Sequence, residues 1–226
     1  MMSRMTVRHG RRLFTGRRIP LWVKLLYTLF VGILAPVYLH DYGPTNFLYF
    51  CDVALLLTLA SLWSENALLA SACAVGILLP QLVWMLDFIG SALHLPLTGM
   101  TAYMFNPALP LFTRMLSFFH FWLPLFLLWL LARLGYYDPR AFRLWTAIAI
   151  VLLVASYLIA PPPPAPADNP GLPVNINYVY GPGDAQPQPW LPPDLYFAGL
   201  LVFLPLLVFW PTHLLLRRFF PPAASA

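Results

Sequence analysis

Two side chains in otherwise apolar segments, Cys51 and His120, have the types that nucleophilic catalysis requires. A thiol can attack a lipid ester carbonyl once its proton has passed to a base, and a neutral imidazole is such a base. The attack would leave a thioester on Cys51, while His120 moves the proton. Asn177 or Arg114 would stabilise the oxyanion or hold a phosphate. No local motif joins these residues, so the hypothesis depends on the elements that carry them.

The composition places those elements in a membrane. Of the 226 residues, 60% are hydrophobic and 9% are charged, whereas soluble domains carry about 25% charged residues. A chain of this length could not bury so much apolar surface in water, so we expect lipid as its solvent. The net charge of +5 does not indicate a nucleic-acid partner, because the basic residues flank apolar segments. We therefore expect an all-α, polytopic transmembrane bundle.

Six apolar runs are long enough to cross a hydrocarbon core, which needs about 20 helical residues. They cover residues 21–39, 46–63, 66–86, 110–132, 143–160 and 195–216. The organisation expected from them is a basic tail over residues 1–20, a bundle over 21–216 and a second tail over 217–226. Small residues in the third run, with Ala72 and Gly76 four apart, predict close helix packing, and Cys73 among them is expected to be a packing residue.

The basic residues give the bundle an orientation. Twelve of the thirteen Lys and Arg residues lie on one side of the expected membrane, and Arg114 is the exception. The positive-inside rule makes that side cytoplasmic, and an even number of spans puts both termini there. The pattern fits a bacterial inner membrane. Arg11 and Arg12 resemble a twin-arginine signal, but no small-residue cleavage site follows the first run, which favours a retained helix.

Counting residues from the expected span ends places Cys51 and His120 at one depth. Cys51 lies about six residues, or about 9 Å, inside the second run, and His120 follows Arg114 by six residues. Both would then lie in the outer third of the bilayer, near lipid ester groups. The alternative is an inert buried thiol and a packing histidine. Asp52 favours that alternative, because its carboxylate disfavours a neighbouring thiolate.

A metal site is a second chemical alternative on the same side of the membrane. The available ligand types are His40, Asp41, Asp87, His94 and His120. None has the spacing of a zinc motif, so we expect neither a metal nor another cofactor. His40 and Asp41 are expected to close the outer end of the first span. Arg114 is expected to hold a lipid phosphate, to pair with Asp87 or to extend to the headgroups.

The longest stretch without helical periodicity is an outer loop over residues 161–194, which contains 12 of the 25 prolines. Preformed polyproline segments lose little entropy on binding. A non-catalytic scaffold or assembly factor, with a protein partner at this loop, is therefore the alternative function. Alternating residue types over 174–180 predict a short extended segment packed on the bundle. Transport has less support, because the chain has no internal repeat and few charges within the spans.

Three short blocks carry a resemblance to a known family. They are Asn46–Cys51 before an apolar run, Phe118–His120 in an aromatic segment, and Asn175–Tyr178 followed by Trp190, Pro192, Pro193 and Tyr196. In this order the blocks resemble the YwaF-like integral membrane proteins, which are related more distantly to ADTRP-type lipid hydrolases and acyltransferases.

The resemblance implies a helical bundle that acts on the acyl esters of membrane lipids near one membrane face. Carried over residue by residue, it makes Cys51 the nucleophile and His120 the base. It places Asn177 and Tyr178 in a loop block that lines the site or orients the histidine. The expected function is therefore a lipid acyltransferase or hydrolase, with membrane lipids as its partners.

Overall fold

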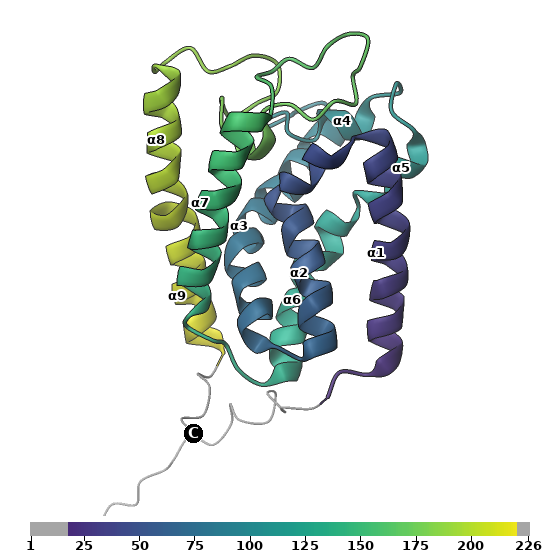
Figure 1. The fold of residues 1–226 in the computed structure, drawn as a ribbon, viewed down its shortest axis with the longest axis vertical. Helices are drawn as coiled ribbons and strands as arrows, with labels where there is room; N and C mark the ends of the chain where they lie inside the picture. The colour runs from purple at the N-terminus through teal and green to yellow at the C-terminus, as the bar shows by residue number, and fades with distance from the viewer. Residues whose placement is uncertain (1–17, 221–226) are drawn as a thin grey trace, which may run out of the picture.

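The computed structural model describes residues 18–220, and this part of the chain forms an all-α bundle (Figure 1). Five helical segments are long and apolar enough to cross a membrane, so the chain is an integral membrane protein. Those segments are α1 (Leu21–Asp41), α3 (Ala67–Ala92), α5 with α6 (Leu111–Leu116 and Phe119–Leu134), α7 (Ala141–Ile159), and α8, η3 and α9 (Pro193–Phe203, Leu204–Phe209 and Trp210–Phe219). Predictions for residues 1–17 and 221–226, including the twin-arginine pair and most of both tails, lie outside the described residues.

The second expected span is shorter than its apolar run. Helix α2 is Phe50–Ser64, 15 residues long, and the 3₁₀ helix η1 (Pro44–Leu48) occupies the start of the run. Tyr49 separates the two because its backbone is extended, with ψ 138°. Cys51 consequently lies in the first turn of a helix. The expectation that it lies six residues inside a helical span is wrong.

Helix α3 is the centre of the bundle and packs against α2, α6, α7 and α9. Its residues Ala70–Gly76 are all buried, since small side chains let neighbouring helices approach closely. The ring of Trp145 on α7 lies so near Gly76 that a Cβ added there would be 1.7 Å from it. The predicted close packing is thus confirmed. Cys73 is fully buried in the core, and both cysteines are free.

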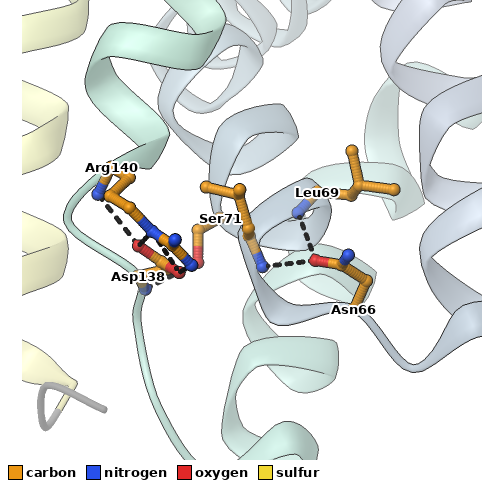
Figure 2. Close-up of polar contacts among 6 residues, drawn as sticks. Asn66, Leu69, Ser71, Asp138 and Arg140 are labelled. Carbon is orange, nitrogen blue, oxygen red and sulfur yellow. Dashed lines mark hydrogen bonds and ion pairs between the residues drawn. The ribbon is translucent and has the colours of Figure 1, made fainter. Parts of the chain in front are cut away.

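A polar cluster at the start of α3 ties this helix to the connection between α6 and α7 (Figure 2). The side-chain oxygen of Asn66 accepts hydrogen bonds from two N–H groups of the first turn, at 2.9 and 3.2 Å. The Ser71 hydroxyl accepts the N–H of Asp138 at 3.0 Å. Arg140 pairs with the Asp138 carboxylate at 2.8 Å, and this contact holds the pKa of Asp138 below its ordinary value.

At the opposite end, Asp87 holds the connection that follows α3. One carboxylate oxygen accepts the backbone N–H groups of Leu97, Thr98 and Gly99 at 2.6 to 3.0 Å. The other accepts the N–H and the hydroxyl of Thr101 at 2.9 and 2.6 Å. The side chain is fully buried, so these donors replace the hydration that the carboxylate gives up. Asp87 is therefore an anchor for the loop that leads to α4 (Ala102–Phe105).

The last span changes its packing at η3, which is a π-helix. Below this point η3 and α9 pack on α3, whereas α8 packs on α7 and none of its residues Pro193–Phe203 is buried. Figure 1 shows α8 at the edge of the bundle beside α7. Pro205 lies within η3, and because proline has no N–H the regular α-helical bonding is interrupted there. The α8 half of the last span thus covers its side of the bundle only loosely.

We expect Asp138→Asn to lower the free energy of unfolding by about 1 kcal/mol near neutral pH. The carboxyl has a lower pKa in the folded chain than its unfolded value of about 3.9. Its contribution is therefore present above about pH 4 and is lost as the pH falls through the folded pKa. Thermal unfolding in detergent from about pH 7 to about pH 3 should show the two proteins converging in acid.

The exposed Asp168 provides the matched control. Asp168→Asn should unfold like the wild type over the whole pH range. A gap between wild type and Asp138→Asn that stays constant into acid would contradict the role given to the Asp138–Arg140 pair.

Candidate active site

A cavity of about 980 Å³ lies at the end of the bundle that carries Asp87 and the longer connections. Cys51, His120, Asn177 and Tyr178 all line it. The structure thus brings the predicted nucleophile and the predicted base to one space, together with the loop block expected beside them. This volume is at the upper end of the usual range for small-molecule sites, about 300–1,000 Å³.

The apolar wall of the cavity borders the lipid-facing surface. Leu82 and Leu86 of α3 line the cavity and are 46% and 49% exposed. From the other side, Phe203 of α8 and Leu207 of η3 line it and are 51% and 61% exposed. The exposed side chains of a membrane bundle contact acyl chains. The cavity can therefore receive an apolar chain laterally, between α3 and α8.

The surroundings of Cys51 act in opposite directions on its thiolate form. It is the second residue of α2, and the positive end of a helix dipole stabilises a negative charge. The backbone N–H groups of Cys51 and Asp52 also lie beside the sulfur. The Asp52 carboxylate acts in the opposite direction, and one of its oxygens accepts a hydrogen bond from Asn46 at 3.0 Å. The helix terminus favours the thiolate, whereas burial and the Asp52 carboxylate disfavour it and are the larger effects, so a base is required to take the thiol proton.

Asn177 fixes the start of α2 from a distant part of the chain. Its side-chain oxygen accepts the N–H of Phe50 at 2.9 Å. Its amide group donates to the Leu48 carbonyl at 2.8 Å and to the Ser156 hydroxyl of α7 at 3.1 Å. The residue that precedes α2 provides no side-chain cap of its own. Asn177 therefore caps the helix whose first turn holds Cys51, and it positions the thiol.

The segment 174–180 is packed on the bundle, as predicted, but it is not extended. It contains the 3₁₀ helix η2 (Ile176–Tyr178), and Asn175, Asn177 and Tyr178 have positive φ angles of 48°, 56° and 62°. The Asn175 side chain bonds to three backbone groups further along the chain, at 2.8 to 2.9 Å. These bonds close a turn. Asparagine suits the position because it adopts the left-handed conformation more readily than most residues and because its side chain can bond to nearby backbone groups. The alternation of residue types therefore predicted the wrong local structure.

The histidine of the site has a defined tautomer. His120 Nδ1 is 2.6 Å from the Ser117 carbonyl oxygen, and a carbonyl only accepts, so Nδ1 carries the hydrogen of the neutral ring. Nε2 is then the basic nitrogen, and it has no hydrogen-bond partner within residues 18–220. The ring stacks on Trp84 of α3 with centroids 4.4 Å apart. The expected continuous helix breaks after Leu116, and the Ser117 carbonyl accepts both the backbone N–H of His120, at 3.1 Å, and its Nδ1–H.

Cys51 and His120 share the cavity without a direct contact. Among the described hydrogen bonds, none joins the sulfur to the imidazole. The two groups approach the cavity from different helices, α2 and α6. This arrangement suits a reaction that is assembled when the substrate binds.

Arg114 does not line the cavity. Its guanidinium donates to the carbonyl oxygens of Leu109 and Met104, at 3.2 and 2.8 Å. The expected alternative of a pairing with Asp87 is not formed, because that carboxylate is held by its own loop. In this structure Arg114 stabilises the connection between α4 and α5, and phosphate binding by its side chain stays a prediction.

The alternative metal ligands are dispersed. Within residues 18–220 no three His, Cys, Asp or Glu side chains gather in a way that could hold a metal ion. His40 pairs with Asp41 at 2.7 Å at the end of α1, and Asp41 also accepts a hydrogen bond from Thr113 of α5. His94 lies in the loop anchored by Asp87. The first pair thus closes the end of α1, as predicted.

Sequence reasoning missed several residues that line the cavity, among them Tyr42, Gln81 and Trp84. Gln81 had a usable signal, since an amide in a long apolar helix is costly unless it serves a purpose. The aromatic residues had none, because 16% of the chain is aromatic. Their placement depends on helix rotation, which hydropathy does not determine.

Comparisons with known proteins do not add a relative. No protein-family model matches the chain, and neither a curated protein nor a solved structure matches it significantly. The resemblance to the YwaF-like proteins therefore rests on the three sequence blocks.

We expect Asn177→Ala to destabilise the protein by about 1–2 kcal/mol, because it leaves the first N–H of α2 without its cap. Thermal unfolding in detergent would measure the change. Asn169→Ala is the matched control, since Asn169 is an exposed residue of the same outer loop. Equal unfolding temperatures for the two variants would contradict the capping role of Asn177.

Proposed function

We propose that this chain is a membrane enzyme that transfers or hydrolyses the acyl groups of membrane lipids. The observation that carries the proposal is the shared cavity: a thiol and an imidazole from two helices line a space bordered by the lipid-facing surface. Cys51 is the proposed nucleophile and His120 the proposed base. The order of the YwaF-like sequence blocks supports the same assignment.

The proposed reaction has two steps. The Cys51 sulfur attacks the ester carbonyl carbon while His120 Nε2 takes the thiol proton. The carbon–oxygen bond of the ester then breaks, the leaving alcohol receives that proton, and the acyl group stays on sulfur as a thioester. In the second step a lipid alcohol or water gives its proton to His120, attacks the thioester and releases the thiol. The reaction needs no cofactor.

Backbone and hydroxyl donors near the sulfur support the transition state of this reaction. Cys51 and Asp52 lie in the first turn of α2, where backbone N–H groups have no acceptor within the helix, so these groups are candidate donors to the oxyanion of the attacked carbonyl. Tyr178 lines the same cavity, and its hydroxyl is a further candidate donor. Asn177 contributes indirectly by holding the start of α2.

We further propose that the cavity faces the outer leaflet of a bacterial inner membrane, with both termini in the cytoplasm. The support is the distribution of the basic residues, twelve of which fall on one expected side. Arg133 donates to the backbone of Arg18 where α1 begins, and this end of the bundle is opposite to the cavity.

The partner-binding alternative has a less specific basis. Pro170, Gly171 and Val174 of the outer loop line the cavity, so part of the loop belongs to the candidate site. A scaffold that binds a protein through this loop would be unaffected by a change at Cys51. The catalytic variants therefore separate the two functions.

We expect Cys51→Ala and His120→Gln each to abolish acyl exchange while the protein remains folded. The first variant removes the nucleophile, and the second removes the base but keeps a side chain of similar size. Purified protein in liposomes that contain a phospholipid and a lysophospholipid acceptor would be assayed by mass spectrometry. Thermal unfolding would establish that each variant is folded.

Cys73→Ala is the matched control, because Cys73 is a buried thiol that does not line the cavity. It should retain exchange activity. Wild-type activity in folded Cys51→Ala would exclude the thioester mechanism and favour the scaffold function.

A further inference from the structure

The cavity contains polar atoms that have no partner within the described chain. They are Oδ1 of Asp52, Oε1 of Gln81 and the hydroxyl of Tyr42. Asp52 is 3% exposed and Gln81 is 2% exposed. A buried polar group that lacks a hydrogen bond costs about 1–3 kcal/mol. Three such groups on one cavity therefore indicate a ligand that supplies the missing bonds.

The carboxylate of Asp52 is oriented so that one oxygen remains available. Asn46 donates to Oδ2 at 3.0 Å, and Asn46 is itself buried. This bond fixes the side chain and leaves Oδ1 as an acceptor in the cavity. Gln81 adds a second acceptor from α3, which packs against α2. Two acceptors from two helices thus require a hydrogen-bond donor on the ligand.

Tyr42 adds the complementary group. It follows α1 directly, and burial, with smaller effects of Asp41 and Asp52, raises its pKa to about 12 despite the opposing effect of Arg114. The phenol therefore keeps its proton at neutral pH and can donate. The effect of Asp52 on Tyr42 also shows that the carboxylate and the phenol belong to one polar region.

A hydroxyl group matches this set of atoms. It donates one hydrogen bond, which Asp52 or Gln81 can accept, and it accepts one, which Tyr42 can donate. An ammonium group donates only and would leave the phenol hydrogen without an acceptor. The neighbouring wall of exposed apolar side chains on α3 and α8 suits a hydrocarbon tail. The matching ligand is an amphiphile with a free hydroxyl at its polar end.

We propose that Asp52, Gln81 and Tyr42 bind the free hydroxyl of a lipid alcohol, such as a lysophospholipid, that serves as the acyl acceptor. This inference rests on the proposed function, and it makes the second step a transfer to an alcohol. Asp52 and Cys51 both line the cavity, so a hydroxyl bound by the carboxyl group occupies the same space as the thioester. The proton of that hydroxyl passes to His120 as its oxygen attacks the acyl carbon. The carbon–sulfur bond then breaks, and the leaving thiolate takes the proton back from His120.

The test uses binding, so that its outcome is separate from turnover. The full-length Cys51→Ala protein in nanodiscs would be titrated with a lysophospholipid that has a free hydroxyl and with its deoxy analogue of equal chain length. Native mass spectrometry would give the two affinities. We expect about tenfold tighter binding of the hydroxyl probe, from the hydrogen bonds that its hydroxyl group adds.

Two further substitutions, each made in the Cys51→Ala protein, identify the side chains that cause the preference for the hydroxyl probe. In Asp52→Asn, Asn46 continues to donate to the remaining oxygen, so the new amide NH₂ group faces the cavity and cannot accept. Gln81→Met keeps the side-chain length and removes the second acceptor. We expect the preference to disappear in Asp52→Asn and to weaken in Gln81→Met.

Thr146→Val is the matched control. Its hydroxyl is also without a partner among the described residues, but it lies on α7 and does not line the cavity. This variant should keep the full preference for the hydroxyl probe. Equal binding of the two probes to Cys51→Ala would overturn the proposal, as would a preference that survives both Asp52→Asn and Gln81→Met.

The assay of acyl exchange separates this proposal from the proposed function. A protein that prefers the hydroxyl probe but has no Cys51-dependent activity would retain the alcohol site and lose the enzymatic assignment. A protein that hydrolyses lipid through Cys51 without a preference for the hydroxyl probe would retain the enzyme and exclude the acceptor site.

Discussion

A polar group in the hydrocarbon core of a membrane must find its partners within the protein, and the arrangement of this bundle follows from that requirement. Asp87 meets it with five hydrogen bonds from one loop. Asn177 meets it by capping α2 and bonding to α7. Among the described residues, five buried side-chain atoms are left without a partner, and three of them line the cavity. Most of the buried polar atoms that lack a hydrogen-bond partner are therefore at the candidate site.

The last span gives this polar region access to lipid. If α8 continued along α3 as closely as α9 does, the apolar wall would be sealed by helix packing. The π-helix η3, with Pro205 inside it, instead separates a lower part that packs on α3 from an upper part that packs on α7. The cavity then combines a polar end among α2, α3 and α6 with an apolar side toward the bilayer. An amphiphile fits both ends at once.

The fold class could be predicted from the sequence, because the lengths of the apolar runs and the positions of the basic residues beside them can be read from it directly. The sequence was insufficient for the breaks in the helices. An extended Tyr49 ends η1, so that α2 begins one residue before Cys51. The break between α5 and α6 contains Ser117, whose carbonyl sets the His120 tautomer. Both features depend on backbone angles that hydropathy does not encode.

The candidate site was only partly predictable from the sequence. Equal depth brought Cys51 and His120 together as a hypothesis, and both line one cavity. Asn177 and Tyr178 also line it, but the principal contacts of Asn177 are with the start of α2. Arg114 is directed to loop carbonyls instead. Such contacts join residues distant in the chain, and no local pattern reports them.

Cys51 is proposed to carry an acyl group during turnover, and intact-protein mass spectrometry tests this role most directly. Wild-type protein would be incubated with phospholipid vesicles, denatured rapidly in acid and weighed. The account predicts a mass increase of one acyl chain that hydroxylamine removes and that Cys51→Ala lacks. Acyl exchange by a protein that never gains this mass, or an adduct that persists in Cys51→Ala, would contradict it.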